Sequence, residues 1–193
     1  MKRTSGLPEF GALVAFATVF LTFSVISKNF LEITNIASML TLASELGIVT
    51  LGVSFLMISG EFDLSCSAIY ALSAYMFAMA GNLGLPSPLA FAIILAFSCL
   101  LGFANGTVTL KTGVPSFITT LGSQMILRGA LFLISGGVTI LWYGDSIMLN
   151  LLSVRGAYGF RPQNFWFILI ATILMIVLAR AKHGTWTFAS GAR

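Results

Sequence analysis

Charge is what this sequence has least of. Only 8% of its 193 residues are Asp, Glu, Lys or Arg, whereas about 25% is usual in a soluble domain. The chain is 58% hydrophobic, its mean hydropathy is +0.99, and so few charges could not cover the apolar surface of a soluble fold. Composition therefore excludes an ordinary soluble domain and a disordered chain, and it predicts an all-α, polytopic helical membrane protein.

Cysteine and histidine are equally scarce, which excludes several kinds of site. Cys66 and Cys99 lie in apolar stretches and form no CxxC, so we expect neither a disulfide nor a metal centre. The single histidine, His183, follows an apolar run among basic residues, and we interpret it as an interfacial polar residue. The sequence holds no phosphate-binding loop of the form G-x-x-x-x-G-K-[ST], and an intramembrane serine protease would need a histidine at membrane depth. We therefore expect no enzyme activity, no metal and no cofactor.

Basic residues outnumber acidic ones, ten against six. They are spread thinly between apolar runs, so we expect no nucleic-acid partner and interpret them as a topology signal. Cytoplasmic loops carry the excess of Lys and Arg in membrane proteins, which predicts a cytoplasmic N-terminus here. That orientation places Lys2, Arg3, Lys111, Arg180, Lys182 and Arg193 inside, and Lys28, Arg155 and Arg161 outside.

Runs without charge predict about six membrane-spanning helices, since a span takes about 20 residues. Turn residues around 81–88, rich in Gly, Pro and Asn, divide the longest run into two spans. Residues 135–163 are expected to form an outer loop, and residues 180–193 a cytoplasmic segment. The predicted spans are residues 10–27, 35–60, 64–81, 88–110, 115–134 and 164–179.

Two ionisable residues fall inside the predicted spans. Counting 1.5 Å per residue from the start of each span places Glu45 about 15 Å deep and Arg128 about 20 Å deep. Charges at such depth are costly and should face the bundle interior or water. Two alternatives stay open: the two side chains neutralise one another as an ion pair, or they line a polar path through the bundle.

A break between the second and third spans is the third candidate feature. Its sequence, residues 60–65, is GEFDLS, and either Asp63 or Ser65 could cap a new helix there. The break is either a solvated turn or a helix start whose N–H groups face a cavity. Non-helical backbone at membrane depth persists only when it is buried in protein or faces water. In the fourth span, Gly102 and Gly106 have the spacing that lets two helices approach closely.

Several segments, taken in chain order, carry a more specific signal. They are residues 43–53 (ASELGIVTLGV), 57–65 (MISGEFDLS), 102–106 (GFANG), 114–122 (VPSFITTLG), 127–129 (LRG) and 136–137 (GG). Together they resemble the motifs of permeases of ABC-type sugar importers, the ribose, xylose and galactose class, over about residues 35–193. Two departures are Cys66, where that family often begins V-G-S, and Ser116, which replaces its usual residue before Phe117.

The resemblance implies a permease subunit of an ATP-driven importer in the bacterial inner membrane, which carries a monosaccharide or related polyol. It implies four kinds of partner: separate ATPase chains that hydrolyse ATP, a periplasmic sugar-binding protein, a second permease subunit, and membrane lipid. The end of the chain looks like the approach to that family's cytoplasmic coupling loop. We therefore expect residues 1–193 to be a single transmembrane region, the N-terminal part of a longer permease.

Under this hypothesis the candidate residues fall into two sets. The expected substrate-path residues are Glu45, Glu61, Asp63, Ser65, Asn105 and Arg128. The expected docking residues for a binding protein are Trp142, Tyr143, Asp145 and Arg155, in the outer loop. Two alternatives remain open: a secondary transporter or channel subunit that binds ions at Glu45 and Asp63, and a permease fragment that does not transport.

Overall fold

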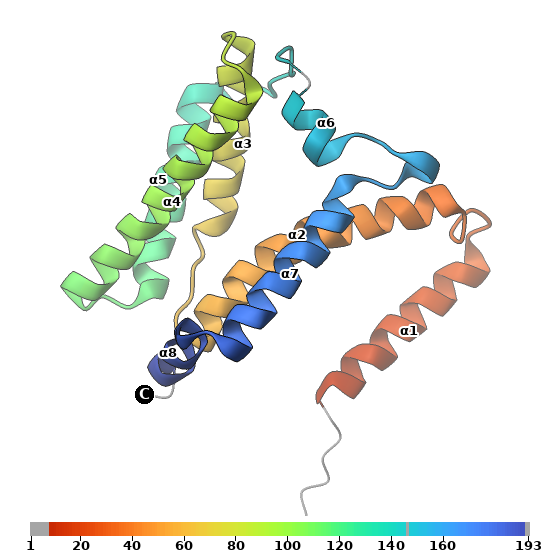
Figure 1. The fold of residues 1–193 in the computed structure, drawn as a ribbon, viewed down its shortest axis with the longest axis horizontal. Helices are drawn as coiled ribbons and strands as arrows, with labels where there is room; N and C mark the ends of the chain where they lie inside the picture. Colours follow the sequence, from red (N-terminus) through yellow and green to blue (C-terminus); the bar gives the residue numbers. More distant parts are fainter. Residues whose placement is uncertain (1–7, 146, 192–193) are drawn as a thin grey trace, which may run out of the picture.

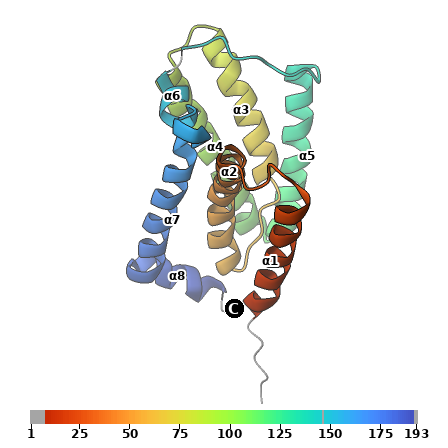
Figure 2. The same ribbon diagram turned by 90° about the vertical axis from the view of Figure 1, so that its right-hand side faces the viewer.

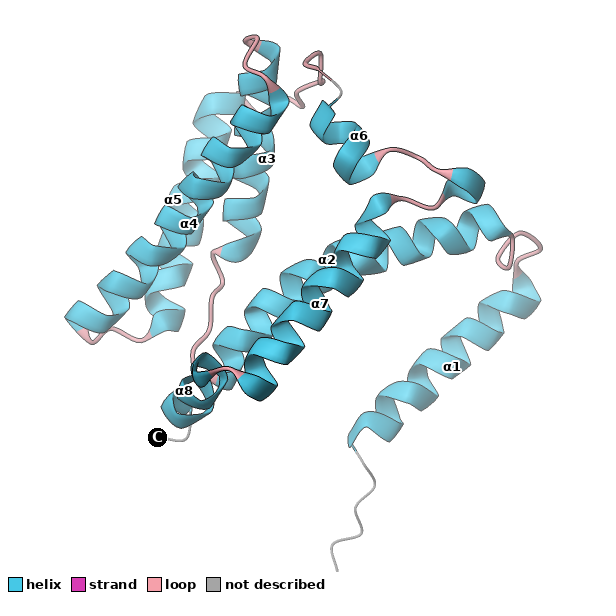
Figure 3. Cartoon of the chain, in the orientation of Figure 1, coloured by secondary structure: helices cyan, strands magenta, loops and turns pink. Residues whose placement is uncertain are grey.

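The described chain is helical apart from its connections (Figure 3). The computed structural model describes residues 8–145 and 147–191, and no strand occurs within these ranges. The predicted all-α class, with a break after the second long helix, is confirmed. The helices are α1 (Pro8–Ile26), α2 (Ile33–Ile58), α3 (Cys66–Asn82), α4 (Ser87–Thr112), α5 (Ser116–Ser135), α6 (Ile147–Ser153), the 3₁₀ turn η1 (Ala157–Gly159), α7 (Pro162–Arg180) and α8 (Lys182–Gly191).

Each predicted span has a counterpart among the long helices, namely α1 to α5 and α7. Four of these, α2, α4, α5 and α7, are long and apolar enough to cross a membrane. Helix α1 adds the apolar run Phe10–Ile26, and α3 has 17 residues, about 25 Å of helix. The chain is therefore a polytopic helical membrane protein.

Proline and glycine set the ends of α4 and α5. Pro86 directly precedes α4 and Pro115 directly precedes α5. A proline suits these places because its fixed φ and missing N–H cost nothing at a helix start. The two helices end where Gly113 and Gly136 take φ values of 70° and 60°, which residues with a Cβ rarely adopt.

The helices form two groups (Figure 1). Helices α3, α4 and α5 pack on one another, and α2, α7 and α8 make up the second group. Helix α6 packs against both α4 and α7 and so joins the groups. Helix α1 packs against the connection that leads to α2, where the Phe30 ring centroid lies 5.3 Å from that of Phe20 and 5.8 Å from that of Phe23.

Few apolar side chains are buried, and those that form a cluster belong to the first group. Ala68, Leu72 and Leu127 form it, at the contact of α3 with α5. Large apolar side chains such as Phe103, Leu110 and Leu133 point outward instead and are exposed. An apolar exterior around a small interior is what a hydrocarbon environment permits.

The segments expected on the two sides of the membrane lie at opposite ends of the molecule. Residues 135–163 are partly helical, with α6 and η1, and residues 182–191 form α8. Figures 1 and 2 both place α6 at one end and α8 at the other. Helix α8 packs against α7 and α2, so the end of the described chain returns to the helix after which the break begins.

Candidate functional site

The break between α2 and α3 is held in place by hydroxyl groups of α5. The backbone N–H of Phe62 donates to Ser116 Oγ at 3.1 Å, and that of Leu64 donates to Thr120 Oγ1 at 3.2 Å. Gly60, at φ 84°, turns the chain away from α2. The non-helical backbone thus finds protein partners, which is the condition for its survival at membrane depth.

A polar network extends from this break into the first helix group. Ser65 Oγ donates to Asp63 Oδ1 at 2.5 Å and accepts from Asn105 Nδ2 at 2.9 Å. Ser123 Oγ donates to Asn105 Oδ1 at 2.5 Å. Ser65 is 0% exposed and Asn105 is 9% exposed, so both are sequestered from solvent. We call Asp63, Ser65, Asn105 and Ser123 the polar network; it ties the break to α4 and α5.

A cavity of about 400 Å³ lies beside the polar network. Its polar side chains include two carboxylates, Glu61 and Asp63, and the amide of Asn105. None of its lining residues is basic, so hydrogen-bond acceptors dominate its polar part. The lining residues are Gly52, Leu56, Glu61, Phe62, Asp63, Gly102, Asn105, Gly106, Thr109, Leu110, Ser116 and Thr120.

Gly102 and Gly106 open onto this cavity. A Cβ built on either glycine would meet nothing within 4 Å, whereas their spacing predicts a close helix contact. That expectation is wrong within the described chain. The missing side chains leave cavity space instead of bringing two helices together.

Four of the six expected substrate-path residues lie close together, and the other two lie elsewhere. Glu61, Asp63 and Asn105 line the cavity, and Ser65 hydrogen-bonds to two of them. Glu45 and Arg128 are both exposed and belong to different helix groups, α2 with α7 and α5 with α3. No ion pair joins Glu45 and Arg128 in the part of the chain that the structure describes. Of the two alternatives, neutralisation of one by the other is therefore not supported.

Glu45 is the thirteenth of the 26 residues of α2 and contacts the start of α7. Its Oε1 accepts a hydrogen bond from Gln163 Nε2 at 3.3 Å, and Gln163 is the second residue of α7. The neighbouring Ser44 Oγ donates to Asn164 Oδ1 at 3.0 Å. Glu45 is therefore level with the first turn of α7 and halfway along α2, and its place near the membrane midplane stays a prediction.

Sequence reasoning missed three members of the site, all on α5. Ser116, Thr120 and Ser123 are the hydroxyls that bind the break and the polar network. Their spacing of four and three residues places them on one face of a helix. That spacing is the signal that would have revealed them.

Of the expected docking residues, Trp142 and Asp145 are built into the fold. The Asp145 carboxylate accepts from the Ser87 N–H at 2.6 Å, from the Ser87 hydroxyl, and from the Ile147 N–H at 3.0 Å. The hydrogen bonds from Ser87 hold the pKa of Asp145 below its usual range. The Trp142 ring stacks on Phe77, with centroids 4.8 Å apart. Asp145 thus fixes the loop at the starts of α4 and α6, and Trp142 fixes it on α3.

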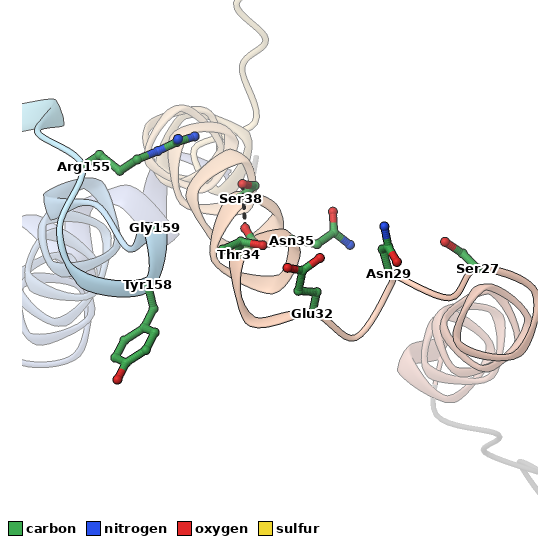
Figure 4. A pocket seen from close by; sticks show the side chains of 9 residues that line it. All are labelled: Ser27, Asn29, Glu32, Thr34, Asn35, Ser38, Arg155, Tyr158 and Gly159. Carbon is green, nitrogen blue, oxygen red and sulfur yellow. Dashed lines mark hydrogen bonds between the residues drawn. The ribbon is translucent and has the colours of Figure 1, made fainter.

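Tyr143 and Arg155 remain at the surface. The Tyr143 side chain is 77% exposed, and its backbone N–H donates to Asn82 Oδ1 at 2.7 Å. Arg155 lines a polar pocket of about 490 Å³ between the loop around η1 and the start of α2. In Figure 4 Arg155 extends toward Ser38, while Tyr158 points away from it. Exposed polar groups of this kind are accessible to a partner.

Long apolar helices, a polar break held by α5 and an enclosed polar network define a membrane protein with an internal polar site. Residues 35–192 match the model of a family described as branched-chain amino acid transport system / permease component. The chain belongs to this permease family. The predicted relationship to ABC importer permeases is confirmed.

Curated relatives are more distant but cover nearly the whole chain. The autoinducer 2 import system permease protein LsrC of Photorhabdus luminescens is 25% identical over 191 residues, which are 99% of this chain and 57% of that protein. The protein of that name from Escherichia coli O9:H4 (strain HS) is 25% identical over 183 residues, 95% of this chain and 53% of its own length. The protein of that name from Yersinia enterocolitica is 26% identical over 180 residues, which are 93% of this chain and 49% of that protein. The chain thus spans about half the length of the curated relatives it matches, and no solved structure gives a significant match.

Proposed function

We propose that the chain is a permease subunit of an ATP-driven importer whose cargo is a small polyhydroxylated molecule, a monosaccharide or a related polyol. The observation that carries this proposal is the cavity beside the polar network. Its carboxylates, amide and hydroxyls suit a neutral cargo with many hydroxyl donors. The relatives named as import permeases for autoinducer 2 agree with a cargo other than an amino acid.

The proposed path residues are Glu61, Asp63, Ser65 and Asn105. They line or support one cavity at the break between α2 and α3. Glu45 and Arg128 lie elsewhere and are left out of this proposal. Glu45 and Asp63 have separate partners, so a secondary transporter that binds ions at these residues would need two ion sites, and the family match favours the ATP-driven importer.

The transport cycle requires partners. We infer separate ATPase chains on the cytoplasmic side, a second permease subunit and a periplasmic binding protein, with the N-terminus of this chain in the cytoplasm. ATP binding and hydrolysis then shift the populations of inward-open and outward-open states, and this chain carries no covalent step. Tyr143 and Arg155 are the proposed docking residues, on a loop that Trp142 and Asp145 hold in position.

Uptake into cells that express the chain with its transport partners tests the proposal. Asp63→Asn keeps the shape and removes an acceptor charge, so we expect uptake of labelled ribose or galactose to fall at least about tenfold, equivalent to about 1.4 kcal/mol. Glu45→Gln is the matched control, because this carboxylate lies outside the cavity and should transport normally. Membrane levels of both variants are measured by immunoblot.

Three results would contradict the proposal. One is an equal loss in Asp63→Asn and Glu45→Gln at equal membrane level. Another is saturable uptake of labelled leucine but of neither sugar. The third is uptake that stops when the proton gradient is dissipated but continues when ATP is depleted, since this is the behaviour of a secondary transporter.

A further inference from the structure

A further cavity, of about 540 Å³, lies between α3, the C-terminal part of α5 and residues 137–140. We call it the Arg128 groove. Arg128 is its only charged lining residue, and most of the others are apolar. The lining is Ala71, Ala74, Tyr75, Ala78, Arg128, Leu131, Phe132, Ser135, Gly137, Val138, Thr139 and Ile140.

The guanidinium of Arg128 has no partner within the described chain. The acids that could serve are engaged or placed elsewhere: Glu45 with Gln163, Asp63 with Ser65, and Asp145 with Ser87. Glu61 lines the other cavity and Glu32 lines the pocket beside Arg155. A cation in an apolar groove of a membrane protein is costly without an anion beside it. An anion from outside this described part of the chain would remove that cost.

Arg128 lies about one third of the way along α5 from the end of that helix. It stands seven residues before Ser135, where α5 ends, so its Cα lies about 10 Å from that end. A long arginine side chain extends from such a depth toward the interface. The phosphate groups of the adjacent leaflet are the anions that a guanidinium extended in this way would approach.

We propose that the Arg128 groove binds one anionic phospholipid, with its phosphate on the guanidinium and an acyl chain along α3. Guanidinium and phosphate form paired, charge-assisted hydrogen bonds. Ala71, Ala74 and Ala78 recur on one side of α3 and leave room for a chain beside it. Phe132 and Val138 are 66% and 69% exposed, so the groove opens toward lipid. A soluble anion would gain nothing from this apolar lining.

Native mass spectrometry of the protein, purified from membranes with the subunits that stay bound, tests the proposal. The delipidated protein is titrated with phosphatidylglycerol or with phosphatidylcholine. We expect one phosphatidylglycerol to bind at least about tenfold more tightly than phosphatidylcholine, and Arg128→Gln to remove this preference. Arg128→Lys should keep part of it. Arg155→Gln is the matched control and should bind as the wild type does.

A second variant covers the case in which Arg128→Gln fails to fold. Ala74→Leu keeps the charge, and because Ala74 is exposed in the groove, the larger side chain fills the acyl site without entering a core. We expect it to weaken phosphatidylglycerol binding several-fold.

Four outcomes would overturn the proposal. The first is equal phosphatidylglycerol binding by the wild type, Arg128→Gln and Ala74→Leu. The second is an equal loss in Arg155→Gln. The third is full competition by glycerol phosphate, which would mark a site for a soluble anion. The fourth is crosslinking of a residue at position 74 to a second subunit in place of lipid.

Discussion

Asn105→Ala is the substitution that most directly tests the polar network. The Asn105 amide donates to Ser65 Oγ at 2.9 Å and accepts from Ser123 Oγ at 2.5 Å. Alanine removes both bonds at once. Ser65 keeps its bond to Asp63, whereas the Ser123 hydroxyl loses the one acceptor described for it. The expected result is a loosened contact of α4 with both the break and α5.

The size of the effect follows from the two lost bonds. Interhelical hydrogen bonds in membrane proteins contribute about 0.6 kcal/mol on average and up to about 1.7 kcal/mol. A buried hydroxyl left without a partner adds a further cost of about 1 kcal/mol. We therefore expect Asn105→Ala to lower the free energy of unfolding by about 1–3 kcal/mol, and Ser123→Ala by about half of that.

The assay is unfolding in mixed micelles as the mole fraction of SDS rises, followed by far-ultraviolet circular dichroism. Thr107→Ala is the control on the same helix, because its hydroxyl bonds only to the Phe103 carbonyl one turn away, and it should cost under about 0.5 kcal/mol. The double variant Asn105→Ala with Ser123→Ala should fall short of additivity, since the two share a bond. Strict additivity, or equal effects of Asn105→Ala and Thr107→Ala, would refute the network.

Two more predictions concern the loop and the packing of α2. Hydrogen bonds from Ser87 lower the pKa of Asp145, so the ionised carboxylate stabilises the folded protein. This stabilisation is complete above the ordinary carboxyl pKa of about 4 and is lost as the pH falls below it. The thermal unfolding temperature of the wild type should therefore fall between pH 7 and pH 3. Asp145→Asn should already unfold at a lower temperature at pH 7 and should lack this further fall. Parallel pH profiles of the two proteins would show that the Asp145 carboxylate does not stabilise the fold. In α2, a Cβ at Gly47 would lie 2.5 Å from the Phe167 ring, and one at Gly52 would meet nothing within 4 Å. In the same SDS assay, Gly47→Ala should lower the free energy of unfolding by about 1 kcal/mol, and Gly52→Ala should raise it by a few tenths of a kcal/mol. A change of the same sign in both variants would show that α2 and α7 do not pack as described.

The spans and the break were predictable because their causes are local. A run without charge sets helix length, and Gly60 ends α2, without reference to the rest of the chain. The predicted cap is wrong in its geometry, because Ser65 precedes α3 without a side-chain capping bond and Asp63 Oδ1 accepts from the Ser65 N–H at 2.7 Å instead. The depth of Glu45 stays a prediction, because it depends on where the membrane lies along α2. Helix α2 has 26 residues, about 39 Å of helix against a hydrocarbon core of about 30 Å. Counting from its start therefore does not locate the membrane.

Contacts between helices that are distant in the sequence could not be predicted either. Glu45 and Arg128 are the charges that sequence singles out at membrane depth, yet they belong to different helix groups. Nothing local tells which helix faces which. Part of the polar network, by contrast, could be predicted, because Ser65 and Asn105 are polar groups in apolar runs. The spacing of Ser116, Thr120 and Ser123 would have indicated the face of α5 that contacts them.

The division into two helix groups has a mechanical consequence. The groups are connected through residues 59–65 near one end of the molecule and through α6 near the other. The buried apolar residues Ala68, Leu72 and Leu127 all belong to one group. Rotation of one group against the other about the line through these two connections would thus leave that core intact. It would change chiefly the width of the cavity, whose walls come from α2 on one side and from α4 and α5 on the other.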